Sequence, residues 1–255
     1  MTAAQVGNGA RLSARPIPDG GTPTQVWVDA GLQLPELDLS SCAELVVVGA
    51  HPDDETLGFG ATASLLAQAG VRTQIVSATD GGAAYPELSV LQRYRLEQTR
   101  RDELRRAAGV LGMYAPVSLG LPDGRVAEHE QRLTDLLIEI LDGKPAGTWC
   151  AAPWRGDGHP DHEAVGRAAA AAVQQTGAVL VEYPVWMWHW AHPGDDAVPW
   201  QRARMTRLTE AALERKRQAA RCFESQYSAP TPGGDPVLPP DVLHRLLTVG
   251  EVAFW

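Results

Sequence analysis

Two short motifs place histidines beside aspartates. In the first, HPDD, His51 is followed at once by Pro52 and then by Asp53 and Asp54. The second is GDGHPDH at 156–162, which contributes Asp157, His159, Asp161 and His162. Adjacent carboxylates repel one another and are poor material for a core, whereas imidazole and carboxylate together are ligands that suit zinc. The residue types therefore predict a metal site.

A plainer role is available for single residues. Each motif precedes a stretch with a helical pattern, so Asp53 or Asp54, and likewise Asp161, could serve only as a helix cap. A lone histidine at such a position is also more often a cap or surface residue. Capping does not explain the histidine and the second aspartate of HPDD. It also does not explain why a second His–Pro–Asp motif occurs in the chain. For any one aspartate, both roles stay open.

The elements that must position these motifs alternate along the chain. Apolar runs predict strands at 44–50, 73–78, 115–119, 147–152 and 178–183. Helical patterns lie between them at 55–69, 88–109, 128–142 and 161–176. This alternation predicts βαβ units and an α/β fold with a mostly parallel central sheet. Ligands bind such sheets at the carboxyl ends of the strands, where both motifs would lie.

The two ends of the chain are less regular. Residues 1–43 are rich in Gly, Pro, Ser and Thr, and predict an irregular N-terminal arm or an edge element, in which QVWVDA (25–30) could form a short strand. Residues 44–255 are expected to form a single domain. Within it, 202–224 predicts one long amphipathic helix. The last residues, RLLTVGEVAFW, predict a closing strand, with an antiparallel direction left open.

Composition limits the partners. The chain has 255 residues, a net charge of −9 and no long basic run, which argues against nucleic acid or an anionic membrane as partner. No apolar stretch is long enough to span a bilayer, and the first residues do not resemble a secretory signal. The three cysteines lack any C-x-x-C pairing, so reduced thiols and a cytoplasmic location are expected.

The two motifs together resemble the LmbE-like, or PIG-L, family of zinc hydrolases. AHPDDETLGFG and GHPDHEAVG carry the resemblance, and VSATDGG, RRDELRRAAGVLG, LGLPDG and KRQAARCFESQ follow the family's order, so that it covers about 44–227. Members remove the acetyl group from N-acetylglucosamine-containing substrates. The resemblance implies a Rossmann-like three-layer fold and a zinc-dependent N-deacetylase, an amide hydrolase. Ala61 and Phe223 depart from the family's usual residues, but neither lies in the metal motifs.

The resemblance also implies roles for individual residues. The metal, zinc with Fe²⁺ as the alternative, would be held by His51, Asp54 and His162. Three protein ligands leave a position open for water, as in catalytic zinc sites. Asp53 would act as the base that deprotonates the metal-bound water. His159, as an imidazolium, would stabilise the oxyanion, and Asp161 would orient and charge it.

Substrate contacts are weaker predictions. Arg100 holds a family position for binding substrate hydroxyls or phosphate, and is otherwise a surface charge. Asp80 and Asp123 end predicted strands and would bind sugar hydroxyls, or else form turns. In YPVWMWHW, an extended segment would put Trp188 on one face with its neighbours Trp186 and Trp190. That face would stack on substrate, form a core wall, or form an interface in a homo-oligomer.

Two other classes of function remain. A non-haem iron oxygenase is the second hypothesis, because His51-x-Asp53 with a distant histidine imitates a two-His-one-carboxylate site. A carbohydrate-binding protein with a silent site is the third. The expected ligand under the leading hypothesis is a small N-acetylated amino-sugar conjugate, whose identity the sequence leaves open.

Overall fold

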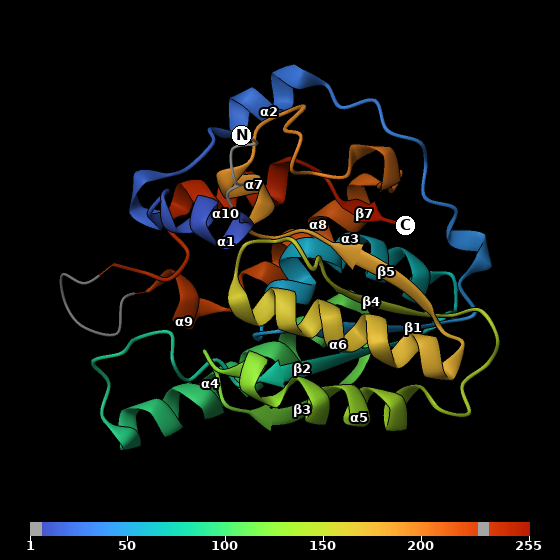
Figure 1. Ribbon diagram of the computed structural model, residues 1–255, viewed down its shortest axis with the longest axis horizontal. Helices are drawn as coiled ribbons and strands as arrows, with labels where there is room; N and C mark the ends of the chain where they lie inside the picture. The colour runs from blue at the N-terminus through green and yellow to red at the C-terminus, as the bar shows by residue number, and fades with distance from the viewer. Residues whose placement is uncertain (1–6, 229–234) are drawn as a thin grey trace, which may run out of the picture.

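A computed structural model describes residues 7–228 and 235–255, and its centre is a seven-stranded sheet (Figure 1). The strands are β1 (Glu44–Gly49), β2 (Arg72–Thr79), β3 (Tyr114–Leu121), β4 (Thr148–Pro153), β5 (Val179–Tyr183), β6 (Ala203–Met205) and β7 (Val252–Phe254). Their order is β3-β2-β1-β4-β5-β7-β6. The first five are parallel, and β7 runs antiparallel to both β5 and β6. The predicted mostly parallel sheet is confirmed.

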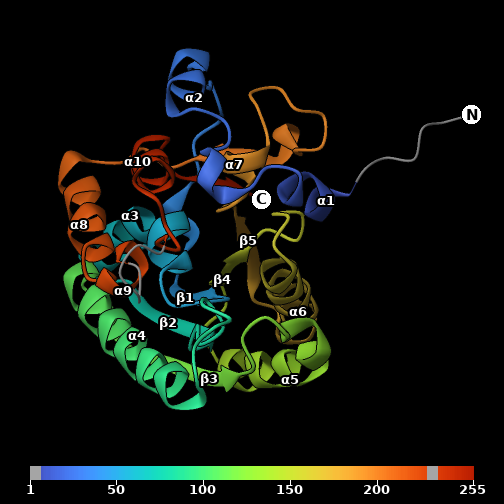
Figure 2. The same cartoon turned by 90° about the vertical axis from the view of Figure 1, so that its left-hand side faces the viewer.

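Helices cover both faces of this sheet. One face carries α3 (Asp54–Gln68), α4 (Val90–Leu111) and α8 (Glu210–Ala220), and the other carries α5 (Glu130–Leu141) and α6 (Pro160–Thr176) (Figure 2). Every residue of β1 is buried, and successive side chains point to opposite faces. Leu45 and Val47 therefore join the core under α3 and α4, while Val46 and Val48 join the core under α5 and α6. The expected three-layer α/β architecture is confirmed.

A further group of short helices gathers at one end of the molecule (Figure 1). It comprises α1 (Asn8–Ser13), α2 (Thr24–Ala30), α7 (Met187–Trp190) and α10 (Pro240–Thr248). QVWVDA belongs to α2, so its prediction as a short strand was wrong. Trp27 of α2 is buried edge-on against Trp188, with ring centroids 4.9 Å apart. That contact anchors the N-terminal residues to the rest of the fold.

The C-terminal third corrects two predictions. The single helix predicted over 202–224 is instead a 3₁₀ turn (η4, Trp200–Arg202), strand β6, helix α8 and a short helix α9 (Glu224–Tyr227). Pairing of β6 with β7 fixes the first part as strand, and Thr209 caps α8 by accepting from the Ala212 N–H. RLLT lies in α10, whereas the antiparallel closing strand is confirmed as β7. The remaining 3₁₀ turns are η1 (Ile17–Asp19), η2 (Leu39–Ser41) and η3 (Val126–His129).

No helix in the described part of the chain has both the length and the apolar character needed to cross a membrane. The longest, α4, spans 22 residues and is rich in arginine and glutamate.

The sheet order locates a switch point between β1 and β4. These strands are parallel neighbours, but the chain leaves β1 towards β2 on one side and leaves β4 towards β5 on the other. Such a point opens a crevice at the carboxyl ends of the strands. His51 follows β1 and the GDGHPDH segment follows β4, so both motifs reach that crevice.

Candidate metal centre

The first motif forms a tight turn between β1 and α3. Asp53 has φ 133° and ψ −30°, and it is the only non-glycine residue with positive φ in the described ranges. A conformation of this kind costs free energy and persists only when its surroundings hold it in place. Asp54 then starts α3, and its Oδ2 accepts the His51 backbone N–H at 2.8 Å. The two neighbouring aspartates therefore point in different directions.

Glu55 supports the strained residue. Its Oε2 accepts the Asp53 backbone N–H at 3.2 Å, and its Oε1 accepts the Thr56 hydroxyl at 2.7 Å. The Glu55 side chain is buried, and Gly49 leaves room for it, because a Cβ at Gly49 would lie 3.0 Å from Oε2. Burial raises the pKa of Glu55 to about 7.

The second motif opens α6 in a different way. Pro160 is the first helical residue, a position that suits proline because its missing N–H is not needed there. His159 is the N-cap, and its Nδ1 accepts the Asp161 N–H at 3.3 Å. His162 therefore lies in the first turn of α6, fully buried and facing Asp54.

His51, Asp54 and His162 converge, as the sequence predicted for a ligand set. His51 Nδ1 lies 3.3 Å from Asp54 Oδ2, and His162 Nε2 lies 3.2 Å from Asp54 Oδ1. In a tetrahedral zinc site with ligands at about 2.0–2.1 Å, neighbouring ligand atoms are about 3.3 Å apart. His162 Nε2 is buried without a hydrogen-bond partner among the described residues. A buried orphan nitrogen beside a carboxylate fits a metal ion.

Each histidine of this set has its other ring nitrogen on a carboxylate. His162 Nδ1 lies 2.8 Å from Asp157 Oδ2, and His51 Nε2 lies 3.0 Å from Asp123 Oδ1 and 3.3 Å from Asp161 Oδ2. Such contacts fix the proton on the outer nitrogen and leave the inner one free to bind metal.

Asp157 is a residue whose role the sequence reasoning missed. Its carboxylate is fully buried and accepts three backbone N–H groups at 2.9 Å, those of Val185, Trp186 and Met187. The same carboxylate therefore joins His162 to the tryptophan-rich segment that follows β5. Its position two residues before His159 was the only signal in the sequence.

Asp161 does not contact the His159 ring through its carboxylate. Its Oδ2 accepts the Gly124 N–H at 2.7 Å and its Oδ1 accepts the Val126 N–H at 3.0 Å, besides the contact with His51. The Asp161 carboxylate thus links α6, the 124–126 loop and His51, and its pairing with His159 stays a prediction. Only the Asp161 backbone N–H reaches His159.

Burial and charge shift the pKa values of this cluster. Burial, together with the charges of His162 and His51, lowers the pKa of His159 to about 3. Burial opposes charge on Asp54, but His162 and His51 outweigh it and hold the Asp54 pKa well below its usual range. Burial raises the pKa of Asp53 to about 8, even though Arg100 acts to lower it. Two adjacent aspartates are thus shifted in opposite directions.

Arg100, predicted as a substrate contact, reaches the site from α4. Its Nη2 donates to the Pro52 carbonyl at 2.8 Å and lies 3.4 Å from Asp53 Oδ1, and its Nη1 donates to the Gly81 carbonyl at 3.0 Å. The guanidinium packs so closely that a Cβ at Gly81 would lie 2.0 Å from Nη1. Arg100 therefore braces the turn that holds Asp53.

A cavity of about 260 Å³ opens onto this cluster. Its polar lining comes from His51, Asp53, Asp54, Arg100, Asp123, His159 and Gln226, and its apolar lining comes mainly from Ile17, Leu57, Ala83, Ala84, Val185, Trp186, Val237 and Leu238. Among the predicted substrate contacts, Arg100 and Asp123 line the cavity and Asp80 and Trp188 do not. Asp80 is held by Arg101 and by the Ser118 hydroxyl, which donates to it at 2.6 Å.

The tryptophan run also differs from its prediction. Residues 187–190 form α7 rather than an extended segment, so alternate residues do not share a face. Trp186 lines the cavity, Trp188 is buried against Trp27, and Trp190 donates its Nε1–H to the Asp157 carbonyl at 2.7 Å. These tryptophans mostly form core around the site.

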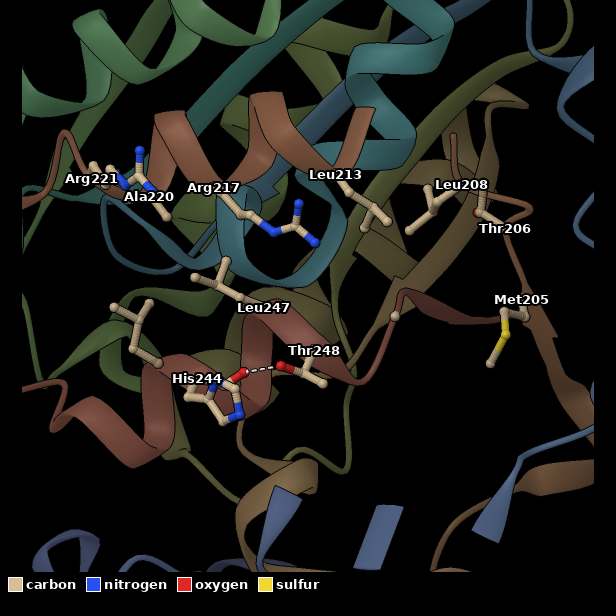
Figure 3. A pocket seen from close by; sticks show the side chains of 12 residues that line it. Met205, Thr206, Leu208, Leu213, Arg217, Ala220, Arg221, His244, Leu247 and Thr248 are labelled. Carbon is tan, nitrogen blue, oxygen red and sulfur yellow. Dashed lines mark hydrogen bonds between the residues drawn. The ribbon is translucent and has the colours of Figure 1, made fainter. Parts of the chain in front are cut away.

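A larger cavity of about 610 Å³ lies between α8 and α10 (Figure 3). Leucines line it together with Arg217, Arg221 and His244, and Arg217 is paired with Glu210 at 2.6 Å. Among the described residues that line it, no cluster of imidazole and carboxylate groups occurs. The chemistry therefore belongs to the smaller cavity.

Comparison with known proteins identifies the family. Residues 46–173, half of the chain, match the family described as GlcNAc-PI de-N-acetylase, PIG-L. The chain belongs to this family. The matched region contains both turns and all three residues of the candidate ligand set, so the predicted family resemblance is confirmed.

Among curated relatives, this PIG-L family chain is similar to the 1D-myo-inositol 2-acetamido-2-deoxy-alpha-D-glucopyranoside deacetylase of Mycobacterium sp. (strain KMS). The two are 35% identical over 154 residues, which cover 51% of this chain and 50% of the relative. The chain thus spans about half the length of the curated relatives it matches.

Solved structures support the fold. A conserved protein of Thermus thermophilus is 27% identical, with a TM-score of 0.54 over 72% of this chain and 80% of that one. The 4-carboxy-2-hydroxymuconate hydratase GalB of a Pseudomonas strain is 16% identical, with a TM-score of 0.55 over 80% of this chain and 82% of that one. Because proteins with different names share this fold, the activity must be argued from the site.

Proposed function

We propose that this protein is a metal-dependent N-deacetylase that hydrolyses the acetamide of a small N-acetylated amino-sugar conjugate. One observation carries the proposal. The buried His162 Nε2 has no hydrogen-bond partner among the described residues and faces Asp54, while the adjacent Asp53 lines the cavity. Family membership and the deacetylase relative support the same reaction.

The metal that suits His51, Asp54 and His162 is zinc, with Fe²⁺ as the alternative, because two imidazoles and a carboxylate form a catalytic ligand set for either ion. The bound ion would supply Lewis acidity and lower the pKa of water at the open position to about 7. Asp157 and the pair Asp123 and Asp161 would hold the two histidines in the ligating tautomer.

Asp53 would be the general base. Its strained backbone turns the carboxylate away from Asp54 and into the cavity, and Glu55 holds that backbone through the Asp53 N–H. The carboxylate takes a proton from the attacking water as the water oxygen bonds to the acetamide carbon. It then returns the proton to the nitrogen as the C–N bond breaks, which yields acetate and the free amine.

His159 would stabilise the carbonyl oxygen as negative charge develops on it. Its Nδ1 accepts the Asp161 N–H, so the ring proton lies on Nε2 and is available to donate into the cavity that His159 lines. A neutral donor in a site shielded from water contributes to catalysis without having to be charged. His159 would thus act as a donor rather than as the imidazolium expected from the sequence.

An acetate-release assay tests the proposal. Purified protein would be stripped of metal, reloaded with zinc or, under anaerobic conditions, with ferrous iron, and supplied with a panel of N-acetylglucosamine conjugates. We expect acetate and free amine in equal amounts, with little release by the metal-free protein. No acetate from any conjugate with a fully loaded site would refute the deacetylase proposal.

Two control measurements separate the other hypotheses. Oxygen consumption by the iron-loaded protein would indicate an oxygenase, whose two-His-one-carboxylate set is compatible with the same three ligands. Binding of the conjugates without acetate release or oxygen consumption would indicate a carbohydrate-binding protein with a silent site.

A further inference from the structure

The cavity contains a buried hydrogen-bond acceptor that the proposed chemistry does not use. Gln226 of α9 lines the cavity and is fully buried, and its Oε1 has no hydrogen-bond partner among the residues that the structure describes. Leu238 donates its N–H at 2.9 Å to the Gln226 main-chain carbonyl, not to the side chain. A buried acceptor left unpaired is unfavourable, so a partner beyond the described residues, such as a bound ligand, would stabilise it.

A relay from α4 fixes the orientation of the Gln226 amide. Glu103 is buried, and both of its carboxylate oxygens are used by Ser225: Oε1 accepts the backbone N–H at 2.8 Å and Oε2 accepts the hydroxyl at 2.6 Å. The one hydroxyl proton of Ser225 is therefore committed to Glu103. Ser225 Oγ is left as an acceptor, and it takes the Gln226 Nε2–H at 2.8 Å. Rotating the amide by half a turn would place two acceptors together, so Nε2 stays on Ser225 and Oε1 points away from it.

The rest of the cavity lining indicates what could pair with Gln226. Leu57, Val185, Trp186, Val237 and Leu238 line the same cavity and offer no side-chain acceptor for a ligand. Arg100 lines it too, and its buried Nε is a donor without a hydrogen-bond partner among the described residues. A hydroxyl group both donates and accepts, so it could satisfy an acceptor and a donor in one cavity.

We propose that Gln226 is a specificity-determining residue that accepts a hydrogen bond from a hydroxyl group of the substrate, with Glu103 and Ser225 as positioning residues that keep its carbonyl oxygen towards the cavity. The proposal rests on the proposed function for the class of substrate. A sugar fits the lining, because it presents an apolar C–H face as well as hydroxyl donors. Gln226 takes no part in the proton transfers assigned to Asp53 and His159.

The test pairs a variant with a set of ligands. Gln226→Leu keeps a similar volume and removes the acceptor. Wild-type protein and variant would be compared on N-acetylglucosamine, on its 3-, 4- and 6-deoxy analogues, and on an analogue whose acetamide nitrogen is methylated. Loss of one neutral hydrogen bond corresponds to roughly a 2- to 12-fold rise in KM for the parent sugar, with kcat and metal content little changed. For wild type, KM should rise by a similar factor when one deoxy analogue replaces the parent sugar. For the variant, KM for that analogue should equal its KM for the parent sugar.

Control variants test whether the effect of Gln226→Leu is purely structural. Gln218→Leu makes the same change on the exposed side of α8, where Gln218 bonds Glu214 at 3.0 Å, and it should leave every KM unchanged. Glu103→Gln keeps Gln226 but frees the Ser225 hydroxyl to donate to it, so the preference for the hydroxyl should fall while the fold, followed by circular dichroism, is kept. This variant carries the test if Gln226→Leu does not fold.

The outcomes distinguish this proposal from the proposed function. If no sugar releases acetate, the deacetylase proposal fails, and the same ligand set is then compared by calorimetric binding to metal-free protein, where the Gln226 pattern is still expected. If Gln226→Leu matches wild type on every ligand, in hydrolysis or in binding, the assignment of Gln226 is overturned alone. The variant could instead lose the wild-type preference for the parent sugar over the N-methylated analogue, while keeping its preference over every deoxy analogue. That result would overturn the hydroxyl assignment.

Discussion

The two His–Pro–Asp turns share a sequence and differ in geometry. HPDDE at 51–55 and HPDHE at 159–163 have the same residue type at four of five positions. In the first turn, the histidine and the fourth residue belong to the candidate ligand set, and Asp53 between them faces the cavity. In the second turn, His159 caps the helix, Asp161 holds the 124–126 loop, and only His162 belongs to that ligand set.

The difference arises from where each helix begins. α3 starts at Asp54, the fourth residue of its motif, so Asp53 stays outside the helix with positive φ. α6 starts at Pro160, the second residue of its motif, so the residue after the proline is already helical. The glutamates differ accordingly. Glu55 accepts the N–H of Asp53, whereas Glu163 reaches back to the N–H of Gly158 at 3.1 Å.

The largest expected effect is loss of the metal from either turn. Asp54→Ala removes the carboxylate that lies between both histidines, and His162→Ala removes the orphan nitrogen, so each should abolish metal binding and activity together. Metal content after purification, measured by mass spectrometry, checks this. His192→Ala changes an exposed histidine outside the cluster and should retain full metal. A metal content near wild type in both ligand variants would contradict the site assignment.

The next effect separates the two aspartates of the first turn. Asp53→Ala should keep the metal and lower turnover about 10²- to 10⁴-fold, since that is what a positioned base contributes. Asp53→Gly should lose as much activity but unfold at a higher temperature than Asp53→Ala. The reason is that φ 133° costs a non-glycine residue about 1–3 kcal/mol, which glycine avoids. Equal melting temperatures for the two variants would mean that the turn stores no strain.

A smaller effect is expected for Asp157, whose carboxylate contacts His162 of the second turn. Asp157→Asn keeps the volume but weakens the contact that holds the proton on His162 Nδ1, and it leaves fewer acceptors for the N–H groups of residues 185–187. Metal affinity should fall about 10- to 100-fold, as for other carboxylates that orient a ligating histidine. Competition with a metal-binding dye measures this at a temperature where the variant is folded. Unchanged affinity would make Asp157 purely a brace for the 185–187 segment.

Much of the fold was predictable because the informative signals are local. Strands β1 to β5 and the helices between them follow from apolar runs and helical periodicity, and their parallel arrangement places both motifs at one edge of the sheet. The convergence of His51, Asp54 and His162 follows from that arrangement and from the family resemblance.

The remainder depends on contacts between distant segments. The residues after Tyr183 turn into α7 because their N–H groups bond the Asp157 carboxylate, which no local pattern in YPVWMWHW reveals. Residues 203–205 become a strand because β7 pairs with them. Asp80, predicted to bind a sugar, is instead held by Arg101 and Ser118 from neighbouring elements. In each case a partner far along the chain decides the structure.

The smallest expected effect concerns Asp161, the counterpart in the second turn of the base in the first. Asp161→Asn keeps one acceptor oxygen for the two N–H groups of Gly124 and Val126, so one of these buried bonds is lost. The free energy of unfolding should fall by about 1–3 kcal/mol. His51 keeps its shorter contact to Asp123, so metal affinity should change less than in Asp157→Asn.

Measurement of kcat distinguishes the two possible partners of the Asp161 carboxylate. With its carboxylate on the 124–126 loop and on His51, Asp161→Asn should leave kcat within a few-fold of wild type once the metal is saturated. If the carboxylate instead oriented and charged His159, as the sequence predicted, kcat would fall strongly at full metal loading while stability stayed near wild type. The ratio of the kinetic loss to the stability loss therefore decides whether the second turn contributes a catalytic pair or, as its hydrogen bonds indicate, a histidine held in place by its own helix.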